Sequence, residues 1–155
     1  MDNPFMARAI QLSIDNVRSG QGGPFGAVVV RDGAIVAEGV NRVTATNDPT
    51  AHAEVVAIRE ACRKLSLFEL KDCELYTSCE PCPMCLGAIY WARLSRVYFG
   101  GLAEDANHAG FDDSSIYREF RQPHSARTIP MTQMMRNEAL AAFHAWNKTS
   151  HKIPY

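Results

Sequence analysis

Three cysteines crowd into seven residues of this chain, CEPCPMC at Cys79 to Cys85, and HAE at His52 to Glu54 lies about one helix and one strand upstream. The odd total of five cysteines, grouped in this way, does not fit a disulfide framework and favours metal binding or catalysis. A site that used both motifs would require the fold to bring the starts of two helices together. This pair of motifs therefore restricts the fold more than any other feature.

Size and composition predict a single domain over residues 1–155, with 46% hydrophobic and 21% charged residues. No apolar run reaches the roughly 20 residues of a membrane span, and the first residues lack the basic start of a signal peptide, so a cytoplasmic protein is expected. The net charge is −1, from 16 basic and 17 acidic residues. The absence of a basic stripe weakens, without excluding, a nucleic-acid partner.

The first half of the chain predicts a helix, a hairpin and a second helix. Asn3 before Pro4 is typical of a helix start, and Gly20 of its end. Two β-branched runs, 27–30 and 35–37, flank Asp32-Gly33 and indicate a hairpin. Asp48-Pro49 is predicted to begin the second helix, because apolar residues then recur at spacings of three and four.

The second half alternates strands and helices. CELYTSC and RVYFGG read as strands on either side of a buried helix, PMCLGAIYWAR, and this order predicts parallel strands beside the antiparallel hairpin. Weaker signals predict a helix capped by Asp112, a fifth strand over RTIPMTQM limited by Pro130, and a last helix capped by Asn137. The result is a mixed sheet with helices on both faces.

His52, Cys82 and Cys85 are the predicted metal ligands. Two cysteines three apart at a helix start can face one ion, the positive helix end favours their thiolates, and nitrogen with sulfur points to zinc. Three ligands leave a tetrahedral position for water, which zinc activates to hydroxide near neutral pH. Glu54 lies near the core side of its helix and is the predicted proton shuttle between that water and a leaving amine. The alternative is a closed structural site with Cys79 as the fourth ligand.

HxE followed by PCxxC is the signature of zinc deaminases, and longer stretches carry a closer resemblance. GGPFGAVVV, NDPTAHAEVVAIREAC, YTSCEPCPMCLGAIYWAR, AGFDDSSIY and the terminal PY resemble bacterial guanine deaminases of the cytidine deaminase fold. This resemblance implies a three-layer αβα sandwich with a mixed five-stranded sheet and one zinc ion per subunit. It also implies hydrolysis of guanine to xanthine and ammonia by a homodimer whose C-terminal segment, about residues 137–155, is exchanged between subunits.

The resemblance also implies substrate contacts. It assigns hydrogen bonds with the base to Asn41 and Asp113, stacking or packing to Phe25 and Trp91, and closure of the pocket to Tyr155. Each of these residues also has an ordinary structural interpretation: the aromatic residues as core, Asn41 as a turn former, Asp113 as a helix cap and Tyr155 as a frayed end. Two rival functions remain open, namely a tRNA-specific adenosine deaminase and a zinc-stabilised binding domain without turnover.

Overall fold

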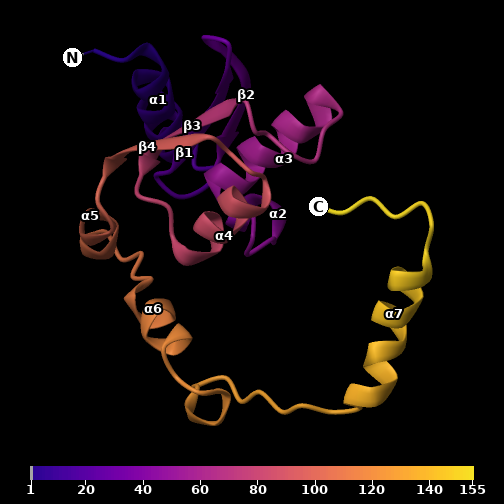
Figure 1. Cartoon of the computed structure of the whole chain (residues 1–155). Coiled ribbons are helices and arrows are strands. Elements are labelled where there is room, and N and C mark those ends of the chain that lie inside the picture. Colours follow the sequence, from indigo (N-terminus) through magenta and orange to yellow (C-terminus); the bar gives the residue numbers. More distant parts are fainter. Residues whose placement is uncertain (1) are drawn as a thin grey trace. The chain divides into compact units, whose positions relative to one another are not determined.

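The computed structural model describes residues 2–155 and divides into two compact units, one ending at Asp113 and the other covering Ser114–Tyr155 (Figure 1). The first unit contains the sheet and most helices; the second contains only helices and irregular segments. In chain order the elements are α1 (Pro4–Arg18), β1 (Gly26–Arg31), β2 (Ala34–Val40), α2 (Val43–Thr46), α3 (Ala53–Leu65), β3 (Cys73–Cys79), α4 (Pro83–Trp91), β4 (Arg96–Gly101), α5 (Ala103–His108), α6 (Ser114–Phe120), the 3-10 helix η1 (His124–Ala126) and α7 (Arg136–Lys148).

The sheet has the order β2-β1-β3-β4. β1 is antiparallel to both β2 and β3, whereas β3 and β4 are parallel, so the predicted mixture of a hairpin and a crossover is confirmed. The hairpin turns at Asp32 and Gly33, which have φ of 52° and 72°. Both residues therefore lie in the left-handed region that a two-residue hairpin loop requires.

A fifth strand is not confirmed, because the described residues form four strands and 127–134 is irregular and mostly exposed. A strand persists only where a neighbour accepts its backbone hydrogen bonds, and Pro130 has no N–H to contribute. The local apolar pattern of this segment was therefore not sufficient to predict its conformation.

Helices cover both faces of the sheet, which gives three layers in the first unit (Figure 1). On one face, Phe5, Met6 and Leu12 of α1 pack against a buried cluster that contains Val28 and Val30. On the other face, α3 and α4 enclose the larger core, which includes Val29, Leu75, Ala57, Ile58 and Ile89. The alternation of Val28, Val29 and Val30 between the two clusters follows from the two-residue period of a strand.

Several helix boundaries differ from those expected. The first helix has its predicted cap, since the Asn3 side chain accepts hydrogen bonds from the N–H groups of Phe5 and Met6 at 3.0 and 2.9 Å. The second predicted helix begins at Ala53, because Asp48 instead closes a turn by accepting from the N–H and hydroxyl of Thr50. The last begins at Arg136, after Met135, so Asn137 does not cap it. The short helices α2, α5 and η1 were not predicted, because they span too few residues to show periodicity.

Helix α4 is less buried than its apolar sequence suggests. Cys85 and Ile89 are buried, but Tyr90 and Trp91 are 73% and 65% exposed. An apolar sequence predicts that a helix has apolar surroundings. It does not indicate which faces of the helix are covered by residues of the same chain.

The second unit buries none of its residues. Its helices α6 and α7 nevertheless carry large apolar side chains, among them Phe120 and Phe143, each 65% exposed. Across residues 2–155, every helix is too short or too polar to cross a bilayer.

Candidate active site

Two helix starts form the centre of the site. His52 is the N-cap residue of α3 and Cys82 is the N-cap residue of α4, both with extended backbone, and Pro83 occupies the first helical position of α4. Neither His52 nor Cys82 uses its side chain to cap its own helix. Both side chains are therefore available for another partner, and Cys85 joins them from the first turn of α4.

The three predicted ligands lie together. Nδ1 of His52 is 3.5 Å from Sγ of Cys82 and 3.5 Å from Sγ of Cys85, and all three ligand atoms lie within 4.8 Å of one another. Zinc bonds of about 2.0 Å to nitrogen and about 2.3 Å to sulfur at a tetrahedral angle separate the two ligand atoms by about 3.5 Å. The cluster therefore fits a zinc ion without rearrangement.

The protonation of the cluster also suits a cation. A hydrogen bond from Cys85, reinforced by His52, lowers the pKa of Cys82 to about 4, despite burial. The same hydrogen bond, together with burial and nearby Glu54, raises the pKa of Cys85. Both sulfurs bind a metal as thiolates, so a dication bound here would take the place of the thiol protons.

Glu54 is buried beside this cluster. Glu54 lies in the first turn of α3 and is 6% exposed. Burial raises the pKa of its carboxyl group, against hydrogen bonds from its own backbone N–H and from Cys85. A carboxyl group whose pKa is moved toward neutrality can both accept and donate a proton, which is the property that general acid–base catalysis requires.

Cys79 does not join the three ligands. Its thiol donates a hydrogen bond to the carbonyl oxygen of Leu102 at 3.5 Å, and the cluster among the described residues consists of His52, Cys82 and Cys85. This arrangement does not support a closed four-ligand structural site with Cys79. A three-ligand cluster leaves one tetrahedral position for water or substrate.

Two of the predicted substrate residues are linked to each other at the ends of β1 and β2. The N–H of Asn41 donates to the carbonyl oxygen of Phe25 at 3.1 Å. The buried Asn41 side chain accepts from the N–H groups of Gly23 and Val43 at 3.4 and 3.3 Å. These bonds fix the amide with its oxygen toward the backbone, so its NH2 group is the part left to donate to a ligand.

Asp113 ends the first unit close to the metal cluster. Burial raises the pKa of its carboxyl group, and the next contribution is repulsion from the Cys82 thiolate. Just before it, Phe111 packs edge-to-face on Phe25, with ring centroids 5.0 Å apart and an interplanar angle of 86°. Phe111 lies in the AGFDDSSIY stretch that carries part of the resemblance, but no local pattern there indicates its contact with Phe25.

The other two predicted contacts lie at the far end of α4 and in the second unit. Trp91 is the last residue of α4, about 13 Å along the helix axis from its start at Cys82. Tyr155 belongs to the second unit and is 73% exposed.

Comparison with known proteins identifies the family. The model of the cytidine and deoxycytidylate deaminase zinc-binding region matches residues 1–101. The chain belongs to this family. It is therefore a zinc-dependent deaminase, and its candidate zinc site is the His52, Cys82 and Cys85 cluster.

Two curated relatives of this deaminase differ in how much of it they match. Guanine deaminase from Bacillus subtilis (strain 168) is 57% identical over 151 residues, 97% of each chain. The tRNA-specific adenosine deaminase from Aquifex aeolicus (strain VF5) is 46% identical over 87 residues, 56% of each chain.

Solved structures agree with the sequence comparison. The crystal structure of the Bacillus subtilis guanine deaminase matches this deaminase with a TM-score of 0.96 and 56% identity, over 100% of this chain and 99% of that one. A second structure, of a protein in complex with 2,6-diaminopurine, matches with a TM-score of 0.68 and 31% identity, over 97% of this chain and 83% of that one. The expected α/β fold of the cytidine deaminase type is thereby confirmed.

Proposed function

We propose that the chain is a guanine deaminase that hydrolyses guanine to xanthine and ammonia. The reaction type follows from a three-ligand metal cluster beside a buried carboxyl group. The substrate is supported by one observation above all, the 57% identity to a guanine deaminase over 97% of the chain. The solved complex with 2,6-diaminopurine, another 2-aminopurine, is consistent with this substrate class.

Each residue of the cluster has a role in this proposal. His52, Cys82 and Cys85 would hold zinc, which when bound would lower the pKa of a water molecule and so supply a nucleophile near neutral pH. Glu54 takes a proton from the attacking water and returns protons to the purine ring and to the departing amine. A C–O bond forms at C2 of guanine and the bond from C2 to the exocyclic nitrogen breaks, which releases ammonia.

Side chains around the cluster hold the guanine base in a fixed position and orientation. We assign hydrogen bonds with the edge of guanine to Asn41 and Asp113, because an amide NH2 and a carboxylate complement its acceptors and donors. Phe25 offers an aromatic wall for the flat ring, and its orientation is supported by the edge-to-face contact with Phe111. Holding the base in this way makes the reaction intramolecular, which supplies much of its acceleration.

The proposal also includes a cytoplasmic homodimer in which residues of about 137–155 are exchanged between subunits. Its support is physical: the second unit buries none of its residues, yet Ile129, Met134 and Phe143 are between 65% and 78% exposed. Large exposed apolar side chains of this kind favour contact with another protein surface that covers them. In the exchanged dimer, Tyr155 closes the pocket of the other subunit and Trp91 packs near it.

A panel of ammonia-release assays tests the activity. The substrates are guanine, adenine, cytosine, their nucleosides, ammeline and a tRNA anticodon stem-loop. The expected result is turnover of guanine that falls by roughly 10²–10⁴-fold in Glu54→Gln while zinc is retained.

The second candidate, a tRNA-specific adenosine deaminase, is favoured by the 46% identity to the Aquifex aeolicus enzyme. Release of ammonia from the stem-loop alone would replace guanine with tRNA as the substrate. No turnover of any substrate by zinc-loaded protein would favour a binding domain.

A further inference from the structure

The segment that leads from β3 to Cys82 and the segment that leads from β4 to Asp113 start side by side. β3 and β4 are parallel neighbours, and Cys79 at the end of β3 pairs with Gly101 at the end of β4. The chain after β3 leads to Cys82, and the chain after β4 leads through α5 to Asp113. Both segments therefore leave the sheet at the same edge, where ligands of sheets with parallel strands commonly bind.

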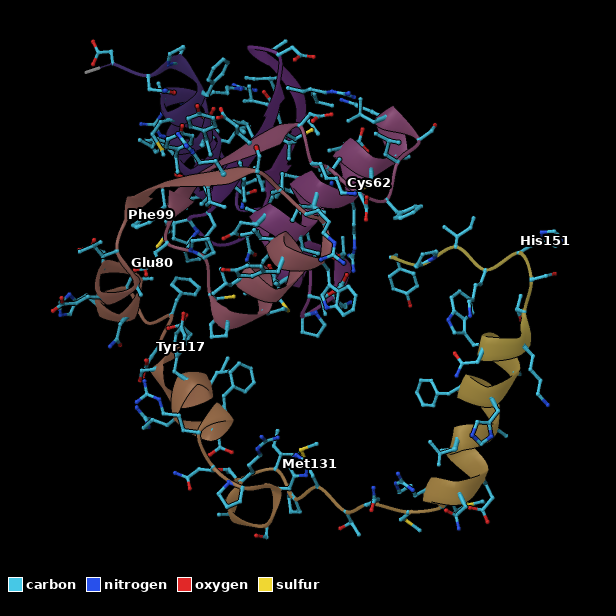
Figure 2. The ribbon with its side chains drawn as sticks, viewed as in Figure 1. Cys62, Glu80, Phe99, Tyr117, Met131 and His151 are labelled. Atoms are coloured by element: carbon cyan, nitrogen blue, oxygen red, sulfur yellow. The ribbon has the colours of Figure 1, made fainter. Side chains whose placement is uncertain are left out.

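Three hydrogen bonds join these two segments directly beyond the sheet. The N–H of Glu80 donates to the carbonyl oxygen of Gly101 at 2.8 Å, and the N–H of Ala103 donates to the Glu80 carboxylate at 3.0 Å. The Cys79 thiol donates to the carbonyl oxygen of Leu102 at 3.5 Å. Figure 2 shows Glu80 beside the first turn of α5. Neither Glu80 nor Cys79 has a role in the proposed chemistry, so these contacts need another explanation.

The segment from Leu102 to Asp113 is held along its length. The Asp105 carboxylate accepts from the N–H of Leu102 at 2.8 Å, which closes the first turn of α5. The N–H of Phe111 donates to the carbonyl oxygen of Ala106 at 2.9 Å, and the Phe111 ring packs on Phe25. The start of α5 is therefore connected to Phe111 by hydrogen bonds and to Phe25 by the ring contact, and Asp113 follows Phe111 by two residues.

We propose that Glu80 is a positioning residue that fixes Asp113 relative to the metal cluster by holding the N–H of Ala103 at the start of α5. Glu80 does not touch guanine; it acts through the segment 102–113, with Cys79 as the neighbouring contact. This inference rests on the proposed role of Asp113 in binding guanine. A merely structural role for Glu80, as an acid near a helix start, would stabilise α5 without affecting the base.

The variants Glu80→Ala and Glu80→Gln separate these roles. Gln keeps an oxygen that can accept from Ala103, whereas Ala removes it. In the zinc-loaded full-length protein, Glu80→Ala is expected to lower kcat/KM for guanine on the order of tenfold, mainly by raising KM, as expected for losing a charge-assisted hydrogen bond. Glu80→Gln should restore most of the loss, and both variants should retain zinc. Loss of zinc in Glu80→Ala, or equal defects in the two variants, would overturn the proposal.

A double-mutant cycle with Asp113→Asn tests the connection itself. If Glu80 acts through Asp113, Glu80→Ala should lower kcat/KM for guanine clearly less in the Asp113→Asn background than in the wild-type background. Additive effects would show that Glu80 acts elsewhere.

Amide hydrogen exchange gives a readout that does not depend on guanine. Exchange at Ala103 and Phe111 should accelerate in Glu80→Ala and remain slow in Glu80→Gln. Unchanged exchange in Glu80→Ala would refute the proposal that Glu80 holds the start of α5. If the wild type does not deaminate guanine, the proposed function fails, while the exchange comparison still decides whether Glu80 holds this segment.

Discussion

Gly39 offers the sharpest test of how the fold places the metal cluster, because it lies where β2 passes closest to the start of α3. A Cβ atom on Gly39 would lie 2.2 Å from the carbonyl oxygen of Ala53, 2.5 Å from the N–H nitrogen of Ala57 and 3.0 Å from the Ala57 Cβ. These neighbours include backbone atoms of a helix, so no side-chain rotation can relieve the clash. Ala53 sits between His52 and Glu54 in the chain. The residue that must move is therefore the one that joins a metal ligand to the proposed proton shuttle.

The expected size of the effect follows from these distances. For Gly39→Ala to widen the 2.2 Å contact to a tolerable 3.0 Å, the start of α3 must retreat from the sheet by about 0.8 Å. Forcing a methyl group into a packed interface costs about 1–3 kcal/mol of folding free energy. A displacement of about 1 Å at reacting groups costs on the order of 100-fold in rate. Gly39→Ala should therefore fold, with reduced stability and a much lower kcat.

The assays are urea unfolding, zinc content and guanine turnover, with Gly87→Ala as the matched control. Gly87 lies within α4, two residues after Cys85, and a Cβ there would meet nothing within 4 Å. That variant should keep its activity and gain up to about 1 kcal/mol from helix propensity. A Gly39→Ala protein with wild-type zinc content and wild-type kcat would refute the claim that this close approach sets the position of His52 and Glu54.

Three further predictions follow from the site and its surroundings. Glu54→Gln should keep zinc but lower kcat by roughly 10²–10⁴-fold, the usual contribution of general acid–base catalysis; zinc-replete protein with an unchanged rate would remove Glu54 from the chemistry. Cys85→Ala should lose most of its zinc by metal analysis after dialysis, whereas Cys79→Ala should retain it, and the reverse order would make Cys79 a ligand. The two hydrogen bonds from Arg8 to Glu38, at 2.7 and 2.8 Å, lower the pKa of Glu38 below its ordinary value of 4.5, despite partial burial. The stability from this pair is thus present above pH 4.5 and lost as pH falls through the lower folded pKa, so Glu38→Gln should cost up to about 1 kcal/mol at pH 7 and nothing in acid. If urea unfolding showed that Glu38→Gln lowers the free energy of unfolding equally at pH 7 and in acid, this account would be contradicted.

The sequence predicts the elements of the first unit well where local chemistry determines them. The cap at Asn3, the turn at Asp32-Gly33 and the helix after Pro83 each depend on a few adjacent residues, and all are confirmed. The zinc cluster is equally predictable, because its ligands lie at helix starts whose sequence spacing limits the geometry. The start of α3 was misplaced for a related reason: Asp48 can cap a helix or close a turn, and the choice depends on Thr50.

Contacts between distant segments could not be predicted in this way. Nothing near Phe111 in the sequence indicates that its ring meets Phe25, and nothing near Glu80 indicates that its carboxylate accepts from Ala103. The Glu80 contact arises because parallel pairing of β3 with β4 brings two chain segments to one edge of the sheet, and Phe25 lies at the same edge because β1 runs antiparallel to β3. The order of strands, which local patterns do not determine, therefore decides which side chains surround the cluster.

The second unit shows the limit of local patterns most clearly. The apolar spacing over NEALAAFHAW predicts a helix, and α7 covers it, but Phe143 and Trp146 remain 65% and 43% exposed. Periodicity indicates that one face of a helix requires cover without identifying the surface that covers it. A segment that buries none of its own residues gains little stability from its own contacts, so its local sequence alone does not determine its conformation. For the same reason the irregular stretch 127–134 escaped prediction, since a strand there would need a neighbour that its own sequence does not specify.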